Sequence, residues 1–174
     1  MKILGAVLAG GHATRFGSDK ALAALGRRAL IDHAIASLDP HCDAIVVVGR
    51  TTAAVTCIPD LPLSDLGPLG GIAGALGFAA DHDFDTVLTT ACDTPFLPRE
   101  VITALRDAAP AYVAGAPTVG LWPTDLAAPL LAHLLADKPR AIRRWAETIG
   151  ASAVLPGVEL ANINTPDDLA KLEY

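Results

Sequence analysis

The sequence has few of the residues that build cross-linked or metal-stabilised folds. Its 174 residues include three cysteines, Cys42, Cys57 and Cys92, and no C-x-x-C pair occurs. An odd, scattered set of this kind indicates neither a disulfide framework nor a structural zinc site. The five histidines show no metal-ligand spacing. Aromatic residues make up only 5% of the chain, and neither heptads nor fixed-period repeats occur, so coiled coils and repeat arrays are also excluded.

Positive charge is also scarce, because 13 Lys and Arg residues stand against 19 Asp and Glu residues, a net charge of −6. This balance argues against nucleic acid or an anionic membrane surface as a partner. No apolar segment approaches the ~20 residues of a membrane span. The short apolar run after Met1-Lys2 ends in two glycines and a charged stretch, and a buried strand explains it without a signal peptide. We therefore expect a cytoplasmic protein.

Apolar runs that alternate with helical stripes predict an open α/β sheet. Hydrophobic residues make up 52% of the chain, enough for one core, so we expect a single domain over residues 1–174. Continuous apolar runs, typical of strands buried on both faces, occur at 3–8, 44–48 and 85–90. Shorter strands are expected at 55–58, 111–114, 118–122 and 151–155, and helices are expected to begin near Leu30, Pro68, Pro98, Thr124 (as a helix cap), Ile142 and Pro166. This order predicts a Rossmann-like, mostly parallel sheet with helices on both faces, which binds ligands beyond the carboxyl ends of its strands.

The segment after the first predicted strand, residues 8–20, reads LAGGHATRFGSDK. Adjacent Gly10 and Gly11 can adopt positive φ, so that successive backbone N–H groups converge on a phosphate or lie against a base. Arg15 and Lys20 add two cations that suit phosphate oxygens. The spacing matches neither the dinucleotide G-x-G-x-x-G motif nor a P-loop, because the lysine comes three positions after the last glycine. The string favours a polyphosphate site over a glycine turn with solvated charges.

Acidic and amide residues follow two later segments. Asp93 comes at the end of the predicted strand 85–90, where a hard carboxylate suits Mg²⁺, which binds through one or two carboxylates plus substrate phosphates. A turn-capping aspartate is the structural alternative. Asn162 and Asn164 flank Ile163 with strand alternation, so both amides would face one side and bind an acceptor phosphate or complete a magnesium shell. A turn and helix cap is the alternative at this segment.

In this order, the motifs resemble those of the nucleotidyltransferases that join an NTP to a phosphorylated acceptor, and within them the molybdenum cofactor guanylyltransferases. The resemblance rests on the opening string, Asp60, Gly67-Pro68-Leu69, residues 91–96 (ACDTPF) and residues 162–166 (NINTP), and spans nearly the whole chain. It implies a nucleotide site formed by Leu8, Ala9, Gly10, Gly11, Lys20, Asp60 and Asp93. It implies catalytic roles for Arg15, Lys20 and Asp93, with Mg²⁺ held by Asp93. It also implies acceptor contacts from Asn162 and Asn164.

The implied reaction transfers GMP from GTP to the terminal phosphate of the molybdenum–molybdopterin cofactor and releases pyrophosphate. The opening Leu8-Ala9-Gly10-Gly11 favours guanine, since the related cytidylyltransferases resemble Leu-Ala-Ala-Gly there. Molybdoenzymes or other cofactor-biosynthesis proteins would be the protein partners. The alternatives are another nucleotidyltransferase, using CTP on the same cofactor or an NTP on a sugar phosphate, and a non-catalytic nucleotide-binding partner in molybdoenzyme assembly. One departure stands out, because the family pattern often has an asparagine after the second strand, where this chain has Val48-Gly49-Arg50.

Overall fold

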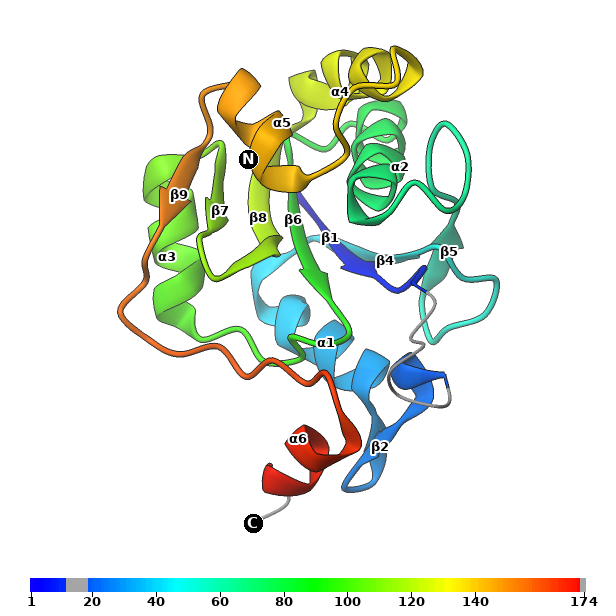
Figure 1. Ribbon diagram of the computed structural model, residues 1–174, viewed down its shortest axis with the longest axis vertical. Coiled ribbons are helices and arrows are strands. Elements are labelled where there is room, and N and C mark those ends of the chain that lie inside the picture. Colours follow the sequence, from blue (N-terminus) through cyan, green and yellow to red (C-terminus); the bar gives the residue numbers. More distant parts are fainter. Residues whose placement is uncertain (12–18, 173–174) are drawn as a thin grey trace.

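The protein is built on one seven-stranded sheet (Figure 1). We describe it from a computed structural model, which covers residues 1–11 and 19–172. The strand order is β5-β4-β1-β6-β8-β7-β9. The bounds are β1 (Ile3–Leu8), β4 (Ala44–Val48), β5 (Thr56–Ile58), β6 (Thr86–Ala91), β7 (Ala111–Val113), β8 (Ala116–Pro123) and β9 (Ser152–Val154). Among these strands β8 alone runs antiparallel to its neighbours, so the predicted mostly parallel α/β sheet is confirmed.

The helices follow the strands closely in sequence. They are α1 (Leu30–Leu38), α2 (Pro68–Asp81), α3 (Arg99–Ala108), α4 (Ala127–Leu135), α5 (Ile142–Thr148) and α6 (Pro166–Lys171). Three short 3₁₀ turns are η1 (Lys20–Leu22), η2 (Asp39–His41) and η3 (Thr124–Leu126). Within the two described stretches, no helix has both the length and the apolar character needed to cross a membrane.

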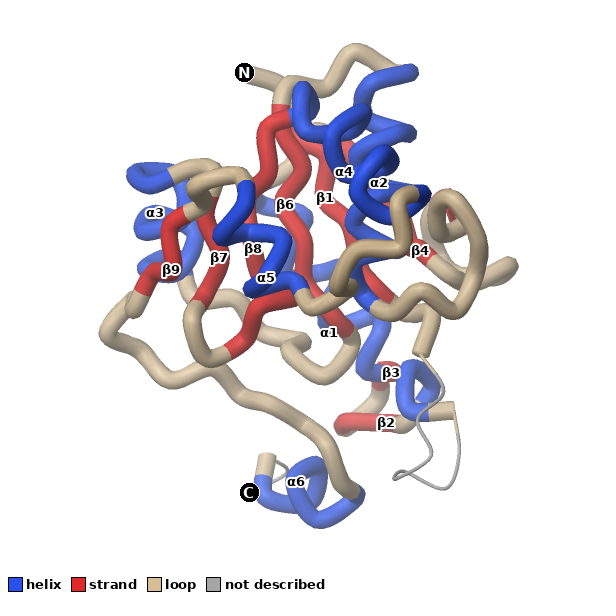
Figure 2. The backbone as a smooth tube through the Cα atoms, turned by 45° about the horizontal axis from the view of Figure 1, so that its top comes forward, coloured by secondary structure: helices blue, strands red, loops and turns tan. Residues whose placement is uncertain are grey.

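Alternation along the strands divides the core into two layers. Leu4, Ala6 and Leu8 of β1 pack in one cluster with buried residues of α2, α4 and α5. Ile3 and Val7 of the same strand pack in the other cluster, with α1 and α3. Because successive side chains of a strand point to opposite faces, a continuous apolar run is what a doubly covered strand requires. Figure 2 shows α2 and α4 on one side of the sheet and α1 on the other.

Two local predictions differ from the structure. Thr124 was expected to cap the fourth helix, but it opens η3 instead, and its buried hydroxyl forms no hydrogen bond to any described residue. Its backbone N–H donates to Asp85 O at 2.9 Å, and the η3 turn moves the start of α4 to Ala127, with Leu126 at the N-cap position. A small hairpin before α1, β2 (Ala24–Leu25) and β3 (Arg28–Ala29), was not predicted. Its strands of two residues are too short to show a period.

The order of the strands creates a switch point beside β1. The chain proceeds from β1 to β4 and β5 on one side and then returns to place β6 on the other side. At such a point the connections diverge and leave a crevice beyond the carboxyl ends of the strands, where ligands bind in open α/β sheets. The segments after β1, β4, β5 and β6 therefore meet at one edge.

Candidate functional site

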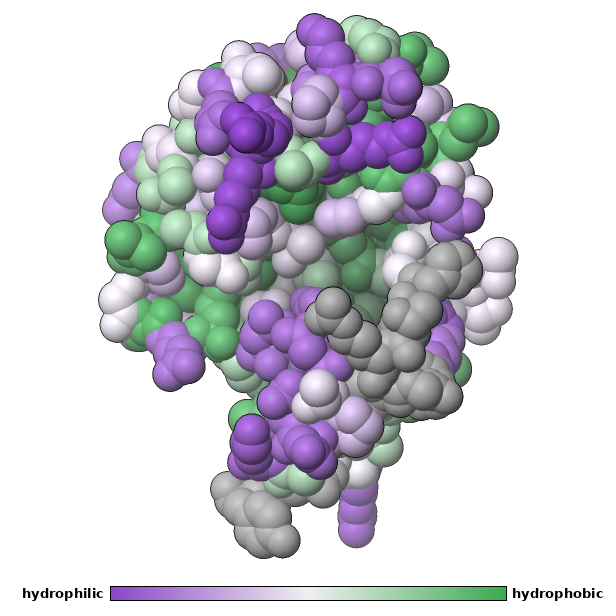
Figure 3. Space-filling view, viewed as in Figure 1, coloured by the Kyte–Doolittle hydropathy of each residue, from purple (hydrophilic) through white to green (hydrophobic). Residues whose placement is uncertain are grey.

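A cavity of about 300 Å³ lies at this edge of the sheet. Residues that follow β1, β5 and β6 line it, together with Gly67 and Pro68 at the start of α2. Figure 3 shows this face of the molecule hollowed near its centre, with hydrophilic residues gathered below the hollow. The sequence-predicted nucleotide residues Leu8, Ala9, Gly10, Gly11, Lys20, Asp60 and Asp93 all line this one cavity.

Backbone atoms form one wall of the cavity. The N–H of Ala9 donates to Val48 O at 3.0 Å, which carries the β1–β4 pairing one residue past the end of β1. Gly10 then lies against Gly49, where a Cβ on Gly10 would come within 3.0 Å of the Gly49 Cα. Any side chain at Gly10 would therefore push the two loops apart. The glycine is needed for this close approach of two backbones.

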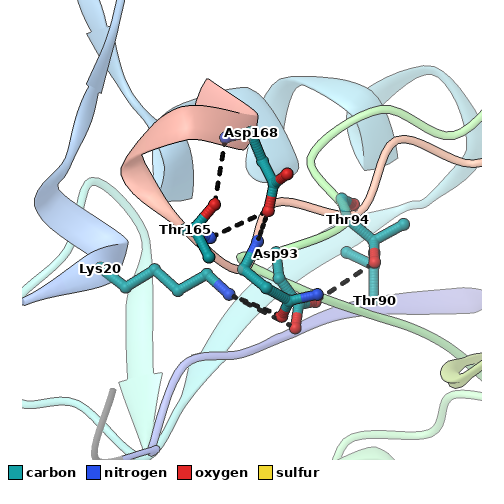
Figure 4. Close-up of polar contacts among 7 residues, drawn as sticks. Lys20, Thr90, Asp93, Thr94, Thr165 and Asp168 are labelled. Carbon is teal, nitrogen blue, oxygen red and sulfur yellow. Dashed lines mark hydrogen bonds and ion pairs between the residues drawn. The ribbon is translucent and has the colours of Figure 1, made fainter. Parts of the chain in front are cut away.

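Lys20 crosses the cavity towards Asp93 and Asn164 (Figure 4). Its ammonium nitrogen lies 3.7 Å from Asp93 Oδ2 and 3.4 Å from Asn164 Oδ1. The Lys20 side chain is only 16% exposed, while that of Asp93 is 33% exposed. One cation thus joins residues from the start, middle and end of the chain.

Short-range hydrogen bonds fix Asp93 at the end of β6. The hydroxyl of Thr94 donates to Asp93 Oδ1 at 3.2 Å, and the hydroxyl of Thr90 donates to Thr94 O at 2.9 Å. The N–H of Ile163 donates to the backbone oxygen of Asp93 at 2.8 Å, which ties the segment before α6 to the same turn. The carboxylate is therefore held at its place by its own turn and by a distant segment.

The segment of Asn164 forms the helix cap that was one of the two readings considered for it. Thr165 and Asp168 form a complete capping box at the start of α6, as the sequence predicted, and Asp168 Oδ2 also accepts the Asn164 N–H at 3.0 Å. This cap fixes the Asn164 backbone while its amide oxygen contacts Lys20. Ile163 is fully buried with Leu25 and Leu30 in a small separate cluster. The cap uses the backbone of Asn164, so the side-chain amide is left to contact Lys20.

Asp60 stands on the side of the cavity nearest α2. The ideal Cβ positions of Gly49 and Gly71 both lie within 3.5 Å of its Oδ1. Burial raises the pKa of this carboxyl, and the neighbouring charge of Asp65 adds to the effect. The carboxyl is only partly buried among these glycine backbones, and this burial already disfavours its charged form. In the sequence, Asp60 had been assigned to the nucleotide site only through the family resemblance.

The oxygen donors at Asp93 and Asn164 fit a hard divalent ion. Both lie within 3.7 Å of one ammonium group, so a carboxylate and an amide oxygen already converge on a cation. Magnesium keeps several waters and takes only one or two protein carboxylates beside substrate phosphates. No group of three or more His, Cys, Asp or Glu residues gathers as a metal site in residues 1–11 and 19–172.

A second cavity of about 410 Å³ adjoins this region on the β7–β9 side. It is lined mostly by apolar residues and glycines, together with Asn162 and the acidic Glu159. Thr118, two residues further along β8, lines the first cavity. Asn162 therefore lines the second cavity, whereas Asn164 lines neither cavity and contacts Lys20, which lines the first.

Arg15 falls outside the described residues, so its predicted role is not addressed by the structure. Three further residues at the site had not been selected from the sequence. Asp19 and Thr118 line the first cavity, and Arg50 forms an ion pair with Asp19 at 2.6 Å. The adjacent Asp19-Lys20 pair was a signal for the first of these, whereas Arg50 was noted only as a departure from the family pattern.

Cys92 is a packing residue beside Asp93, as expected from the sequence. Its side chain is buried in the α1–α3 cluster, and burial raises the pKa of its thiol to about 12. A thiol of this kind is not ionised near neutral pH and cannot act as a nucleophile. The chemistry of the site therefore rests on oxygen and nitrogen groups.

Comparison with known proteins agrees with this geometry. Residues 5–155 match the family model described as the MobA-like NTP transferase domain. The chain belongs to this family. The molybdenum cofactor guanylyltransferase of Rhodobacter capsulatus is 35% identical, over 99% of this chain and 96% of that protein. The enzyme of the same name from Rhizobium leguminosarum bv. trifolii is also 35% identical, over 99% of this chain.

Solved structures show the same fold. Molybdopterin-guanine dinucleotide biosynthesis protein A from Archaeoglobus fulgidus superposes on this MobA-like chain with a TM-score of 0.72, at 24% identity, over 98% of this chain and 96% of that one. A 4-diphosphocytidyl-2C-methyl-D-erythritol synthase gives a TM-score of 0.68 at 15% identity. The predicted family, the predicted α/β fold and the prediction of a nucleotidyltransferase are therefore confirmed.

Proposed function

We propose that residues 1–174 act as one molybdenum cofactor guanylyltransferase domain, which transfers GMP from GTP to the terminal phosphate of molybdenum–molybdopterin. One observation carries the proposal. Lys20, Asp93 and Asn164 meet within 3.7 Å at the edge of a cavity walled by Gly10 and Gly11. This is the set of groups that a triphosphate and a divalent ion need, in a chain of the MobA-like family.

In the proposed complex the nucleotide lies along Leu8 to Gly11, with Asp60 near the nucleoside part and Lys20 at the phosphates. Arg15 would add a second cation there, as the sequence suggests. Asp93, with the Asn164 amide oxygen beside it, would hold Mg²⁺. When bound, the ion would neutralise charge on the triphosphate and on the departing pyrophosphate.

The transfer needs no protein base in this proposal. The attacking group is a phosphate monoester, whose second pKa is about 6, so its oxygen is largely deprotonated at neutral pH. That oxygen forms a bond to the α-phosphorus of GTP while the bond to the bridging oxygen of pyrophosphate breaks. The protein supplies in-line placement and charge neutralisation. In this account Cys92, whose thiol pKa is raised by burial, takes no part in the chemistry.

The second cavity supports a binding position for the pterin part of the acceptor. Asn162 lines it, and Asn164, two residues on, stands beside Lys20. We propose that the acceptor phosphate lies near Asn164 and that the pterin part extends over Asn162 and Ala116. An Asn162→Ala variant should then raise KM for the cofactor about tenfold, the equivalent of about 1.4 kcal/mol, and leave KM for GTP unchanged.

The decisive experiment incubates the protein with Mg²⁺, GTP and molybdenum–molybdopterin and analyses the products by mass. The guanine dinucleotide form and pyrophosphate should appear together. Asp93→Asn and Lys20→Ala should each lower turnover about 100-fold or more while the thermal unfolding temperature stays close to that of the wild type. Glu147→Gln, at an exposed residue that lines neither cavity, is the control.

Two results would contradict the proposal. Wild-type protein that consumes no GTP in the presence of the acceptor is not this guanylyltransferase. Near-normal turnover in Asp93→Asn or Lys20→Ala would show that the reaction uses other residues than those assigned.

A further inference from the structure

Gly49 and Arg50, which follow β4, each contact a residue of the segment 8–20 that follows β1. Gly49 lies against Gly10, and the Arg50 guanidinium pairs with Asp19, the residue before Lys20. We propose that Gly49 and Arg50 form a clamp that sets the position of Lys20, and that Arg50 is a positioning residue for the transfer reaction. The inference rests on the proposed function for its effect on turnover, but the clamp itself can be tested without turnover.

The first arm of the clamp is a backbone contact. Gly49 adopts a φ of 82°, a conformation that favours glycine, and a Cβ there would lie 2.5 Å from the Gly10 Cα. The Gly49 N–H donates to Ile58 O at 2.9 Å, so β5 holds this residue in place. Gly10, which follows β1, therefore packs against the loop at Gly49, and β5 holds that loop in place.

The second arm is a two-point ion pair. Arg50 Nη1 donates to Asp19 Oδ1 at 3.0 Å and Nη2 donates to Oδ2 at 2.6 Å. Parallel bonds of this kind fix the orientation as well as the distance of the carboxylate. The Arg50 side chain is 19% exposed, so solvent competes with it only in part, and the pair keeps the pKa of Asp19 below its ordinary value.

Asp19 passes this restraint to Lys20. Its Oδ1 accepts the N–H of Ala21 at 3.2 Å, which caps the short turn η1, and Ala21 is buried below it. Lys20 lies between these two anchored residues, so the origin of its side chain is fixed. An ammonium on a four-carbon stem reaches many places. With the Lys20 backbone held in place, its ammonium group stays in the region of Asp93 and Asn164.

We assign Arg50 a role through Asp19, because each of its two terminal nitrogens donates a hydrogen bond to that carboxylate. A double-mutant cycle separates the two roles. If Arg50 works through Asp19, then Arg50→Gln and Asp19→Asn should cause similar losses and the double variant should be no worse than either. If Arg50 also binds substrate by itself, the losses should add.

The experiment measures kcat and KM for GTP in Arg50→Gln, Asp19→Asn, the double variant and Arg50→Lys. Asparagine retains the capping oxygen for Ala21, so Asp19→Asn removes the charge pair and little else. We expect kcat/KM to fall about 10- to 100-fold in each single variant, mainly through kcat, with partial recovery in Arg50→Lys. Arg140→Gln breaks a more exposed ion pair, in which a single nitrogen lies 3.2 Å from Asp137, away from both cavities, and should stay within about twofold of wild type.

Hydrogen exchange supplies a measurement that does not depend on turnover. The N–H groups of Ala21, Leu22 and Ala23 donate to Asp19 or Lys20 within the turn. Their exchange should become faster in Arg50→Gln and remain unchanged in Arg140→Gln. Unchanged exchange overturns the clamp whether or not the protein is a guanylyltransferase. Faster exchange with additive kinetic losses, or with no loss in an active enzyme, overturns the role of Arg50 as a positioning residue.

Discussion

The carboxyl group of Asp60 shows how a single residue at this site changes the free energy of unfolding. Its pKa is raised, first by burial and then by the charge of Asp65. Below the pKa of the unfolded chain, both states hold the proton and the group has no effect on stability. As the pH rises through that pKa and the higher folded pKa, the folded state must carry a charge that its surroundings disfavour. At neutral pH, Asp60 therefore destabilises the fold.

We predict that Asp60→Asn raises the thermal unfolding temperature at pH 7 by up to about 3 °C and lowers turnover with GTP. The gain is kept below about 1 kcal/mol because the carboxyl remains partly solvated. It should shrink as the pH is lowered and vanish only below the ordinary pKa of an aspartate, about 3.9, where the folded and unfolded chains both hold the proton. Calorimetry at a series of pH values measures it. A lower unfolding temperature for the variant at pH 7 would show that Asp60 stabilises the fold instead.

At the scale of elements, helix α2 explains why the loop before it is held so close to the cavity. Its glycines let the helix approach the segment that carries Asp60, and a Cβ on Gly74 would collide with the carbonyl oxygen of Pro59. These glycines lower the intrinsic helix stability of α2, since each glycine costs about 1 kcal/mol relative to alanine in a helix interior. The sequence predicted the helix and its apolar face but not the reason for its glycines.

We therefore predict opposite results for two alanine substitutions in α2. Gly74→Ala should destabilise the protein by about 1–3 kcal/mol, because the new methyl group meets backbone that cannot move aside. Gly77→Ala should be neutral or slightly stabilising, because its Cβ would meet only the tip of the Leu61 side chain, at 3.0 Å. Urea unfolding of both variants tests this, and equal stability of the two would contradict the close packing at Pro59.

Helices and strands were predicted best where their apolar residues pack into the two core layers. β1 occupies the predicted residues, and α1, α2 and β4 begin where the apolar spacing and proline signals placed them. One error falls where a short turn intervenes between a local signal and its helix. Thr124 has the side chain of a good cap, yet η3 separates it from α4, whose N-cap position is Leu126, and its hydroxyl forms no hydrogen bond to a described residue.

At the scale of the whole molecule, the site draws on segments separated by up to 144 residues, as the Lys20–Asn164 contact shows. Figure 1 shows α6, which follows Asn164, next to the β2 hairpin near the start of the chain. Ile163, Leu25 and Leu30 form the apolar contact between these two regions. Ligand binding at this junction should therefore stabilise the molecule as a unit.

We predict that GTP with Mg²⁺ raises the unfolding temperature of the wild type more than CTP with Mg²⁺ does. At about 100 times its Kd a ligand adds about 2.7 kcal/mol, which corresponds to roughly 5–10 °C for a chain of this size. The shift should decrease without Mg²⁺ and in Asp93→Asn. Stronger protection by CTP would contradict the preference for guanine, which rests on Leu8-Ala9-Gly10-Gly11.

The sequence by itself determined the class of fold and, through its resemblance to known enzymes, the family and seven of the cavity residues, because apolar period, glycine spacing and ordered motifs can be read along the chain. Only the tertiary structure decided that Lys20 lies between Asp93 and Asn164, that Asp60 is held among glycine backbones, and that Arg50 pairs with Asp19. These facts depend on the order of the strands and on which loops meet at one edge of the sheet. Distances between segments far apart in the chain are set by packing, which no local pattern encodes.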